Sequence, residues 1–377
     1  MHSFSRHMIA AATLVVLGST SAHAAGFKAG EWDLSVGGFI NAFYTHTSCS
    51  GSSAITGLAL GSSALGCGGK DSSTTIGNGL LPNGLVTTAK THEGDWDLSA
   101  TMMIGSAVAS DSAIGNNNNV DVRQGFMTFG KKDFGTVKLG RDYGSFGLNA
   151  VLGDMTLIGV GAPVNATQAN RVSLGHIGAG YTYPGHYGQI TYTAPAAGDV
   201  TVSAGLYSPI NGSATATAQS QPQLQAQVKW SAGGAAAWLG AKTQSFKASP
   251  DFTMSGVEVG GSLTLGGLGL LANLQSGKAL GVLADADSGN VDQTNALIQA
   301  TYAVTGSTKA GLSVGQSKLK NAVGAGLESN SSLTLGVYHN LTKSLTLTGE
   351  VSQTKSRSAS GLEAKLDGVA VGGVLFF

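Results

Sequence analysis

Apolar and polar residues alternate with a period of two in many segments of this chain, and this pattern constrains the fold more than any other feature. The segment QLQAQVKW at residues 223–230 puts Leu, Ala, Val and Trp on one face and three Gln and a Lys on the other. The same alternation recurs at residues 200–207, 257–265 and 345–351. A period of two is the side-chain period of a β-strand, so the chain is predicted to be all-β.

The second face of these strands is polar or glycine each time, and the apolar face carries no charge. A soluble β-sandwich instead pairs an apolar inner face with a polar outer one. A barrel wall in lipid presents apolar residues outward and polar or small residues to its lumen. Charged residues make up only 11% of the chain, against about 25% in soluble proteins. We therefore predict a transmembrane antiparallel β-barrel.

The N-terminus has the parts of a signal peptide: a basic start, an apolar run from Met8 to Leu17 and an A-x-A sequence at Ala22–Ala24. The apolar run is about ten residues, short of the roughly 20 that a membrane-spanning helix needs. We predict that residues 1–24 are cleaved after export, which leaves residues 25–377 as the barrel.

Turn-forming residues divide the mature chain into about sixteen expected strands. We place them at 31–45, 84–93, 95–109, 120–130, 134–142, 187–195, 199–208, 222–231, 234–246, 252–265, 268–277, 291–304, 307–319, 330–341, 344–356 and 364–377. Short turns alternate with long connections at 46–83, 110–119, 143–186, 209–221, 278–290 and 320–329. Short turns at one end and long loops at the other are typical of outer-membrane barrels.

Composition and motifs exclude several other functions. The formal net charge is zero, so we expect no nucleic-acid partner. The sequence contains no H-E-x-x-H motif, and its histidines lie singly. A G-x-S-x-G occurs at residues 311–315 and a G-x-x-x-x-G-K at residues 125–131, but both begin inside predicted strands and not at the turn into a helix that these motifs need, and Lys132 stands where the second needs Ser or Thr. We therefore expect no enzyme activity, cofactor or metal. Cys49 and Cys67 are the only cysteines, and in an exported chain we expect a disulfide within one surface loop, with two free thiols as the alternative.

One stretch carries a specific resemblance. The sequence VRQGFMTFGKKDFGTVKLGRDY, Val122 to Tyr143, resembles the strand, turn and strand that precede the constriction loop in general trimeric porins of Gram-negative bacteria. The resemblance implies a sixteen-stranded homotrimer in the cell outer membrane, surrounded by lipid and lipopolysaccharide. It also implies a third long loop folded into the lumen, and passive diffusion of small hydrophilic solutes and ions through a water-filled channel. The terminal Phe377 on an apolar strand resembles the signal read by the barrel assembly machinery.

Carried onto this sequence, the resemblance places the constriction loop from Gly144 to about His186. Asp154 is the one acidic residue of this loop before Arg171, whereas the family's loop generally carries a pair of carboxylates. Arg123 occupies the position of the family's wall arginine opposite the loop. We therefore expect Asp154 and Arg123 to face each other across the narrowest part of the lumen.

Strand phase adds three further residues. The phase that puts Val122 and Phe126 toward lipid puts Asp121, like Arg123, into the lumen. Lys138 is expected in the lumen because its apolar neighbours face lipid. Arg141 is in phase with the lipid face near the loop end of its strand, where an arginine would either extend to the lipid headgroups or be covered by a neighbouring subunit. Our hypothesis is the contact with a neighbouring subunit.

Two alternatives to an open diffusion pore are a substrate-selective channel and a plugged structural or adhesin barrel. A row of aromatic side chains would favour the first, and the tyrosines are a modest sign of one: Tyr181, Tyr183, Tyr187 and Tyr192. Bulky inward side chains would favour the second. The inward positions are instead rich in glycine, serine and glutamine, which favours open water.

Overall fold

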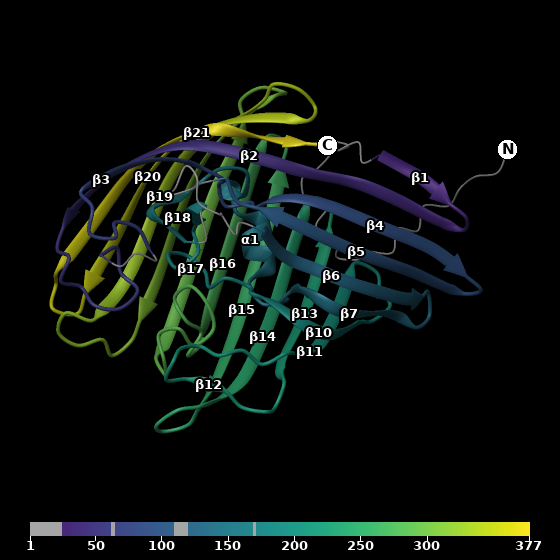
Figure 1. Ribbon diagram of the computed structural model, residues 1–377, viewed down its shortest axis with the longest axis horizontal. Helices are drawn as coiled ribbons and strands as arrows, with labels where there is room; N and C mark the ends of the chain where they lie inside the picture. Colours follow the sequence, from purple (N-terminus) through teal and green to yellow (C-terminus); the bar gives the residue numbers. More distant parts are fainter. Residues whose placement is uncertain (1–24, 62–64, 109–119, 169–170) are drawn as a thin grey trace.

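A computed structural model describes residues 25–61, 65–108, 120–168 and 171–377, and the expected signal peptide lies outside them (Figure 1). Sixteen antiparallel strands form one closed barrel, as the alternation predicts. The barrel strands are β2 (Trp32–Gly51), β4 (Asn83–Glu93), β5 (Trp96–Ser106), β6 (Val120–Lys131), β7 (Gly135–Tyr143), β10 (His186–Thr193), β11 (Val200–Tyr207), β13 (Gln223–Ala232), β14 (Ala235–Lys247), β15 (Phe252–Leu265), β16 (Leu268–Lys278), β17 (Asp292–Ala303), β18 (Thr308–Leu319), β19 (Leu327–Asn340), β20 (Leu345–Ser358) and β21 (Glu363–Phe376).

The first and last barrel strands close the sheet. β2 pairs with β21 from Phe39 opposite Phe376 to Gly51 opposite Ala364, and the two strands lie side by side in Figure 1. Beyond this ladder, Gly38 N donates to Phe377 O at 2.8 Å. Closure satisfies the backbone groups that an open sheet would leave unpaired at its edges.

A few short elements accompany the barrel. Three short strands pair alongside it, and a hairpin, a one-turn helix and a 3₁₀ turn lie between β7 and β10. They are β1 (Ala25–Ala29), β3 (Ser72–Gly77), β12 (Thr217–Ala218), β8 (Ala162–Gln168), β9 (Arg171–Gly175), α1 (Leu148–Gly153) and η1 (Met155–Ile158). No helix among the described residues has the length and apolar character to cross a membrane.

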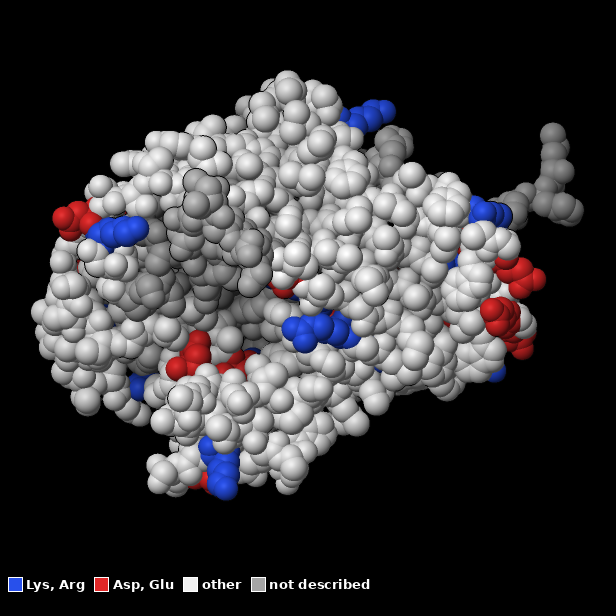
Figure 2. All heavy atoms as spheres, viewed as in Figure 1, with Lys and Arg blue, Asp and Glu red and all other residues white. Residues whose placement is uncertain are grey.

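The two faces of each strand differ as the sequence predicts. On β13, Leu224 is 46% exposed on the outside, whereas its neighbour Gln225 is 2% exposed on the inside. In Figure 2 the charged side chains gather around a hollow and at the right-hand end, where the turn after β4 lies. The surface between them is almost free of charge, as a band in contact with lipid requires.

A β-bulge changes the phase of β6. Its pairing with β5 shifts between Met103 and Gly105, so that Val122 and Arg123 together face one residue of β5. Arg123 and Gln124 therefore both point inward, and Phe126, which follows Gln124 in phase, is 7% exposed inside the barrel. The prediction that Phe126 faces lipid is wrong, because strict alternation does not hold across a bulge.

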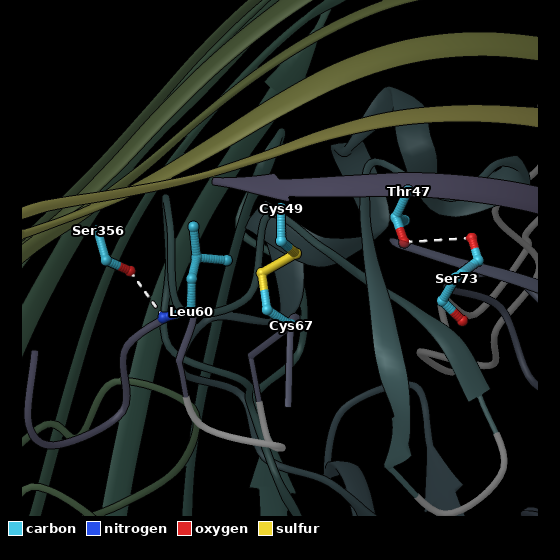
Figure 3. Close-up of a disulfide and its surroundings, with 6 residues drawn as sticks. All are labelled: Thr47, Cys49, Leu60, Cys67, Ser73 and Ser356. Carbon is cyan, nitrogen blue, oxygen red and sulfur yellow. Dashed lines mark hydrogen bonds between the residues drawn. A yellow bond between two sulfur atoms is a disulfide. The ribbon is translucent and has the colours of Figure 1, made fainter. Parts of the chain in front are cut away.

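A disulfide joins Cys49 to Cys67 across a sequence separation of 18, with the two Cα atoms 6.0 Å apart. Cys49 lies on the inward phase of β2, opposite the buried Leu366 of β21. Figure 3 shows the returning chain beneath β2, with Leu60 N donating to Ser356 Oγ at 2.9 Å. The disulfide therefore holds Cys67, in the connection between β2 and β4, at the inner side of the barrel mouth.

Candidate functional site

The connection between β7 and β10 is called the lumen loop below, and its described residues, 144–168 and 171–185, run inside the barrel. It carries α1 and η1, and α1 lies within the barrel in Figure 1. Gly147, just before α1, has a φ of 82°, a conformation that glycine adopts without steric cost. This turn directs the chain into the lumen instead of along the barrel wall.

Inward side chains of the wall hold the lumen loop by its backbone. Glu350 Oε2 accepts hydrogen bonds from Val160 N and Gly161 N, both at 2.8 Å, and Glu258 Oε2 accepts one from Gly147 N at 2.9 Å. The other wall acceptors are Gln225, Gln275, Gln299 and Ser317. Buried N–H groups need such partners, so these inward polar residues position the loop.

The loop approaches the wall too closely for a side chain at one point. A Cβ on Gly159 would lie 2.0 Å from Glu350 Oε1. Glycine is therefore the residue that fits at this position. From strand phase alone the inward glutamines were expected to face water. Strand phase gives the direction of a side chain but not its partner, so the role of these glutamines in holding the loop could not be predicted.

Asp154 lies in a closed cluster within the lumen loop. Its carboxylate accepts from Thr156 N at 2.9 Å and from Tyr181 OH at 2.8 Å, and His176 Nδ1 lies 3.0 Å away. Burial alone would raise the pKa of Asp154, but His176 and these hydrogen bonds hold it below its usual range. Burial and the adjacent carboxylate raise the pKa of Tyr181.

This position differs from the one expected for Asp154. Its side chain and that of His176 are 0% exposed, so the carboxylate presents no charge to water in this structure. Asp154 instead joins η1 to the segment around Tyr181. The physical reason is local, because Asp154 is also the N-cap of η1 and accepts from Thr156 N two residues later.

Arg123 contacts the lumen loop from the wall. Its Nε donates to Asp121 Oδ2 at 2.6 Å, and its Nη1 donates to Tyr183 OH at 2.8 Å. Arg123 is 5% exposed, and it does not contact Asp154 in the structure. The structure therefore brings together Arg123, Asp121 and Tyr183 and leaves Asp154 apart from them.

Lys138 points inward, as its phase predicts. It forms an ion pair with Asp142, which also accepts from Gln124 Nε2 at 2.8 Å. The Lys138 ammonium lies 5.1 Å from the centre of the Phe126 ring. The inward cations of β6 and β7 are thus each paired with a carboxylate on their own strand.

Two other inward lysines have no such partner among the described residues. Lys229 Nζ donates to Asn149 Oδ1 at 3.1 Å, and Lys309 Nζ lies 5.5 Å from the centre of the Tyr338 ring. Neither has a carboxylate within 4.0 Å in the described part of the chain. Lys309 was not among the residues expected in the lumen, although it is in phase with the inward Gly311 and Ser313 of the same strand.

The four tyrosines do not form one aromatic row. Tyr181 binds Asp154, Tyr183 binds Arg123, and Tyr187 OH donates to Asp285 Oδ2 at 2.9 Å. Tyr192 faces outward, where its hydroxyl donates to Phe134 O. Three of the four hydroxyls therefore serve buried charged groups inside the barrel.

Arg141 is exposed on the outer face of β7, between Gly125 of β6 and Gly188 of β10. Phe377 is 40% exposed beside the closing ladder. Within the described residues, no group of three or more His, Cys, Asp or Glu side chains could hold a metal ion.

The comparisons with known proteins agree with this architecture. A family model described as Gram-negative porin matches residues 10–359. The anion-selective porin of Comamonas acidovorans is 19% identical and has a TM-score of 0.67, with coverage of 92% of this chain and 100% of that one. The outer membrane channel DcaP of Acinetobacter baumannii is 15% identical, with a TM-score of 0.68 and coverage of 94% and 100%. Salmonella typhi OmpF, in complex with daunomycin, is 16% identical, with a TM-score of 0.63 and coverage of 94% and 100%. At these identities the structures show a shared fold, and no curated protein matches the sequence.

Proposed function

This chain belongs to the Gram-negative porin family and is an outer-membrane channel for passive diffusion, and we propose that it passes small hydrophilic solutes with a preference for anions. Family and fold indicate a channel and not an enzyme. The observation that carries the proposal is the different exposure of acidic and basic groups around the lumen loop.

The carboxylates that contact the lumen loop are buried and hydrogen-bonded to it. Asp154, Glu258 and Glu350 are at most 4% exposed, and each accepts hydrogen bonds from the loop backbone. Lys229 and Lys309 are half-buried in the wall and lack a carboxylate partner among the described residues. A low-dielectric wall focuses the field of such charges into the pore, which raises the local concentration of anions. The Comamonas acidovorans structure of similar fold is itself named as an anion-selective porin.

Reversal potential in a planar bilayer under a salt gradient tests this preference. We expect an anion-selective sign for the refolded protein, and a shift toward zero when Lys229→Gln and Lys309→Gln are combined. Lys318→Gln is the matched control, because Lys318 lies on β18 with Lys309 but faces outward. A cation-selective sign, or an unchanged potential in the double variant, would contradict the proposal.

We also propose that the channel is a homotrimer and that Arg141 lies at the subunit contact. An exposed guanidinium on the outer wall needs a partner other than lipid chains, and the flanking Gly125 and Gly188 leave space for a neighbouring chain. A Vibrio cholerae OmpT structure with 15% identity and a TM-score of 0.55 is described as a trimer form, with coverage of 92% of this chain and 100% of that one. Arg141→Glu should lower the temperature at which the trimer dissociates on native gels, and undiminished heat stability would refute the contact.

Export and surroundings complete the proposal. We propose that residues 1–24 are cleaved, that the assembly machinery reads the strand ending at Phe377, and that lipopolysaccharide surrounds the barrel. Outward cations at the loop ends of β18, β20 and β21 support the last point: Lys318, Lys355, Arg357 and Lys365. Removing Phe377 should lower the yield of heat-modifiable barrel in the outer membrane relative to an internal Phe27→Leu control.

A further inference from the structure

A second loop also lies inside the barrel. This loop, Ala279–Val291, connects β16 to β17, and its Leu280 is 0% exposed. Leu280 packs at Gly256 of β15, where a Cβ would lie 2.3 Å from Leu280 Cδ2. Gly256 alternates with outward Ser255 and Val257, so Leu280 is on the lumen side of the wall. The second loop therefore bends inward at the mouth.

The second loop touches the lumen loop directly. Gly281 O accepts from Thr182 Oγ1 at 2.7 Å, and Leu283 O accepts from Tyr183 N at 3.0 Å. A Cβ on Gly178 would lie 2.8 Å from Leu283 Cδ2, which shows how closely the two loops pack. The two loops thus share one boundary inside the barrel.

A buried ion pair fixes the second loop to the wall. Asp285 pairs with Lys242 of β14, and it also accepts from Tyr187 OH at 2.9 Å and from Gln223 Nε2 at 2.7 Å. Asp285 is 1% exposed and Lys242 is 4% exposed. A buried charge of either sign is costly without its partner, so the pair strongly favours the inward position of the loop.

The second loop also has its own internal order. Asp287 accepts hydrogen bonds from Val282 N, Leu283 N and Ala284 N, at 2.7 to 2.8 Å. These bonds keep the loop compact whether or not it is attached to the wall. Asp285 then determines where this compact loop lies.

We propose that the second loop forms another wall of the narrowest part of the channel, and that Asp285 and Lys242 are its positioning residues. The lumen loop narrows the channel from one side, and the second loop occupies the space beside it along β14, β15 and β16. This inference rests on the proposed function, because the position of the loop matters to solutes only in a conducting channel.

The test uses full-length refolded protein with Asp285→Ala and Lys242→Met, each alone. Both should raise single-channel conductance and shift the size limit for sugars, measured by liposome swelling, toward larger sugars. Combining Lys242→Met with Asp285→Leu leaves no unpaired buried charge, so conductance should return toward the unsubstituted value. Asp292→Asn is the control, because Asp292 is an exposed carboxyl at the end of the same loop.

A shortened chain covers the case in which the single variants fail to fold. Ala279 N donates to Val291 O at 2.7 Å, so the loop ends are already adjacent. Joining Leu280 to Asn290 should give a folded barrel with higher conductance and a larger size limit.

The outcomes separate the two ideas. Folded variants with unchanged conductance and size limit would overturn the role of the second loop while leaving the channel intact. Absence of conductance from unsubstituted, correctly folded protein would instead overturn the diffusion channel itself.

Discussion

The two loops inside the barrel are held in different ways. Six wall side chains on strands from β13 to β20 accept hydrogen bonds from backbone N–H groups of the lumen loop. Its own cluster around Asp154 also joins distant parts of it. The second loop is fixed to the wall chiefly through one carboxylate, Asp285, which binds Lys242, Tyr187 and Gln223. Distributed contacts tolerate the loss of any one member, whereas contacts that converge on one buried charge do not. The second loop should therefore be the easier of the two to release by one substitution in the wall.

The strongest test of this difference is inside the lumen loop, at Asp154→Ala. The change leaves His176 and Tyr181 buried without their shared partner, and each buried polar group left without a partner costs about 1–3 kcal/mol. Amide exchange should accelerate at Met155–Ile158 and remain slow in the barrel strands. The wall contacts should keep the loop inside the lumen, so conductance should change less than in Asp285→Ala. A larger change in conductance would break the comparison.

Acid provides a smaller perturbation of the same cluster. Because the pKa of folded Asp154 is below its usual value of about 3.9, its contribution to stability is fully present above that pH. The contribution is lost as the pH falls toward the lowered pKa. In the second loop burial raises the pKa of Asp287, so stability linked to that carboxyl increases with acid. Amide exchange below pH 4 should therefore accelerate in the lumen loop first, and acceleration in the second loop first would contradict this.

The smallest effect is expected at a single wall acceptor. Gln225→Ala removes the partner of Phe146 N and should cost the loop about 1 kcal/mol, because the other acceptors remain. Conductance should stay close to the unsubstituted value. Gln227→Ala is a neighbouring control, since it also loses one bond to the loop, to Ser145 O. Small and additive effects of the two changes on conductance would support a loop held by many separate contacts. A large effect from either change would contradict it.

The barrel itself follows from the sequence, because alternation repeats in many strands and the turns are short at one end. The interior does not follow as readily. Phase placed Lys138 and Arg123 inward, but it failed at Phe126, where one bulge residue reverses the alternation. Asp154 is acidic and lies in the expected loop, yet its cap position and His176 enclose it. Such side-chain contacts join residues far apart in the sequence, so the periodicity of apolar residues along a strand cannot predict them.

The second loop shows the same limit more clearly. Its sequence has no strand alternation, so it was predicted only as a long connection. Lys242 and Asp285 are 43 residues apart, and neither position distinguishes itself from other lumen or loop charges. Lys242 and Asp285 come together only in the folded barrel.

The ladder between β2 and β21 has a consequence for how the protein is made. A ring of strands has no edge, but every stage before the ring closes has two, each with a row of unpaired backbone groups. β21 is the barrel strand that covers both edges, by pairing with β2 and β20. Until β21 has paired with both neighbours, the exposed edges would also pair with other copies of the chain, so partly folded protein should be prone to aggregate.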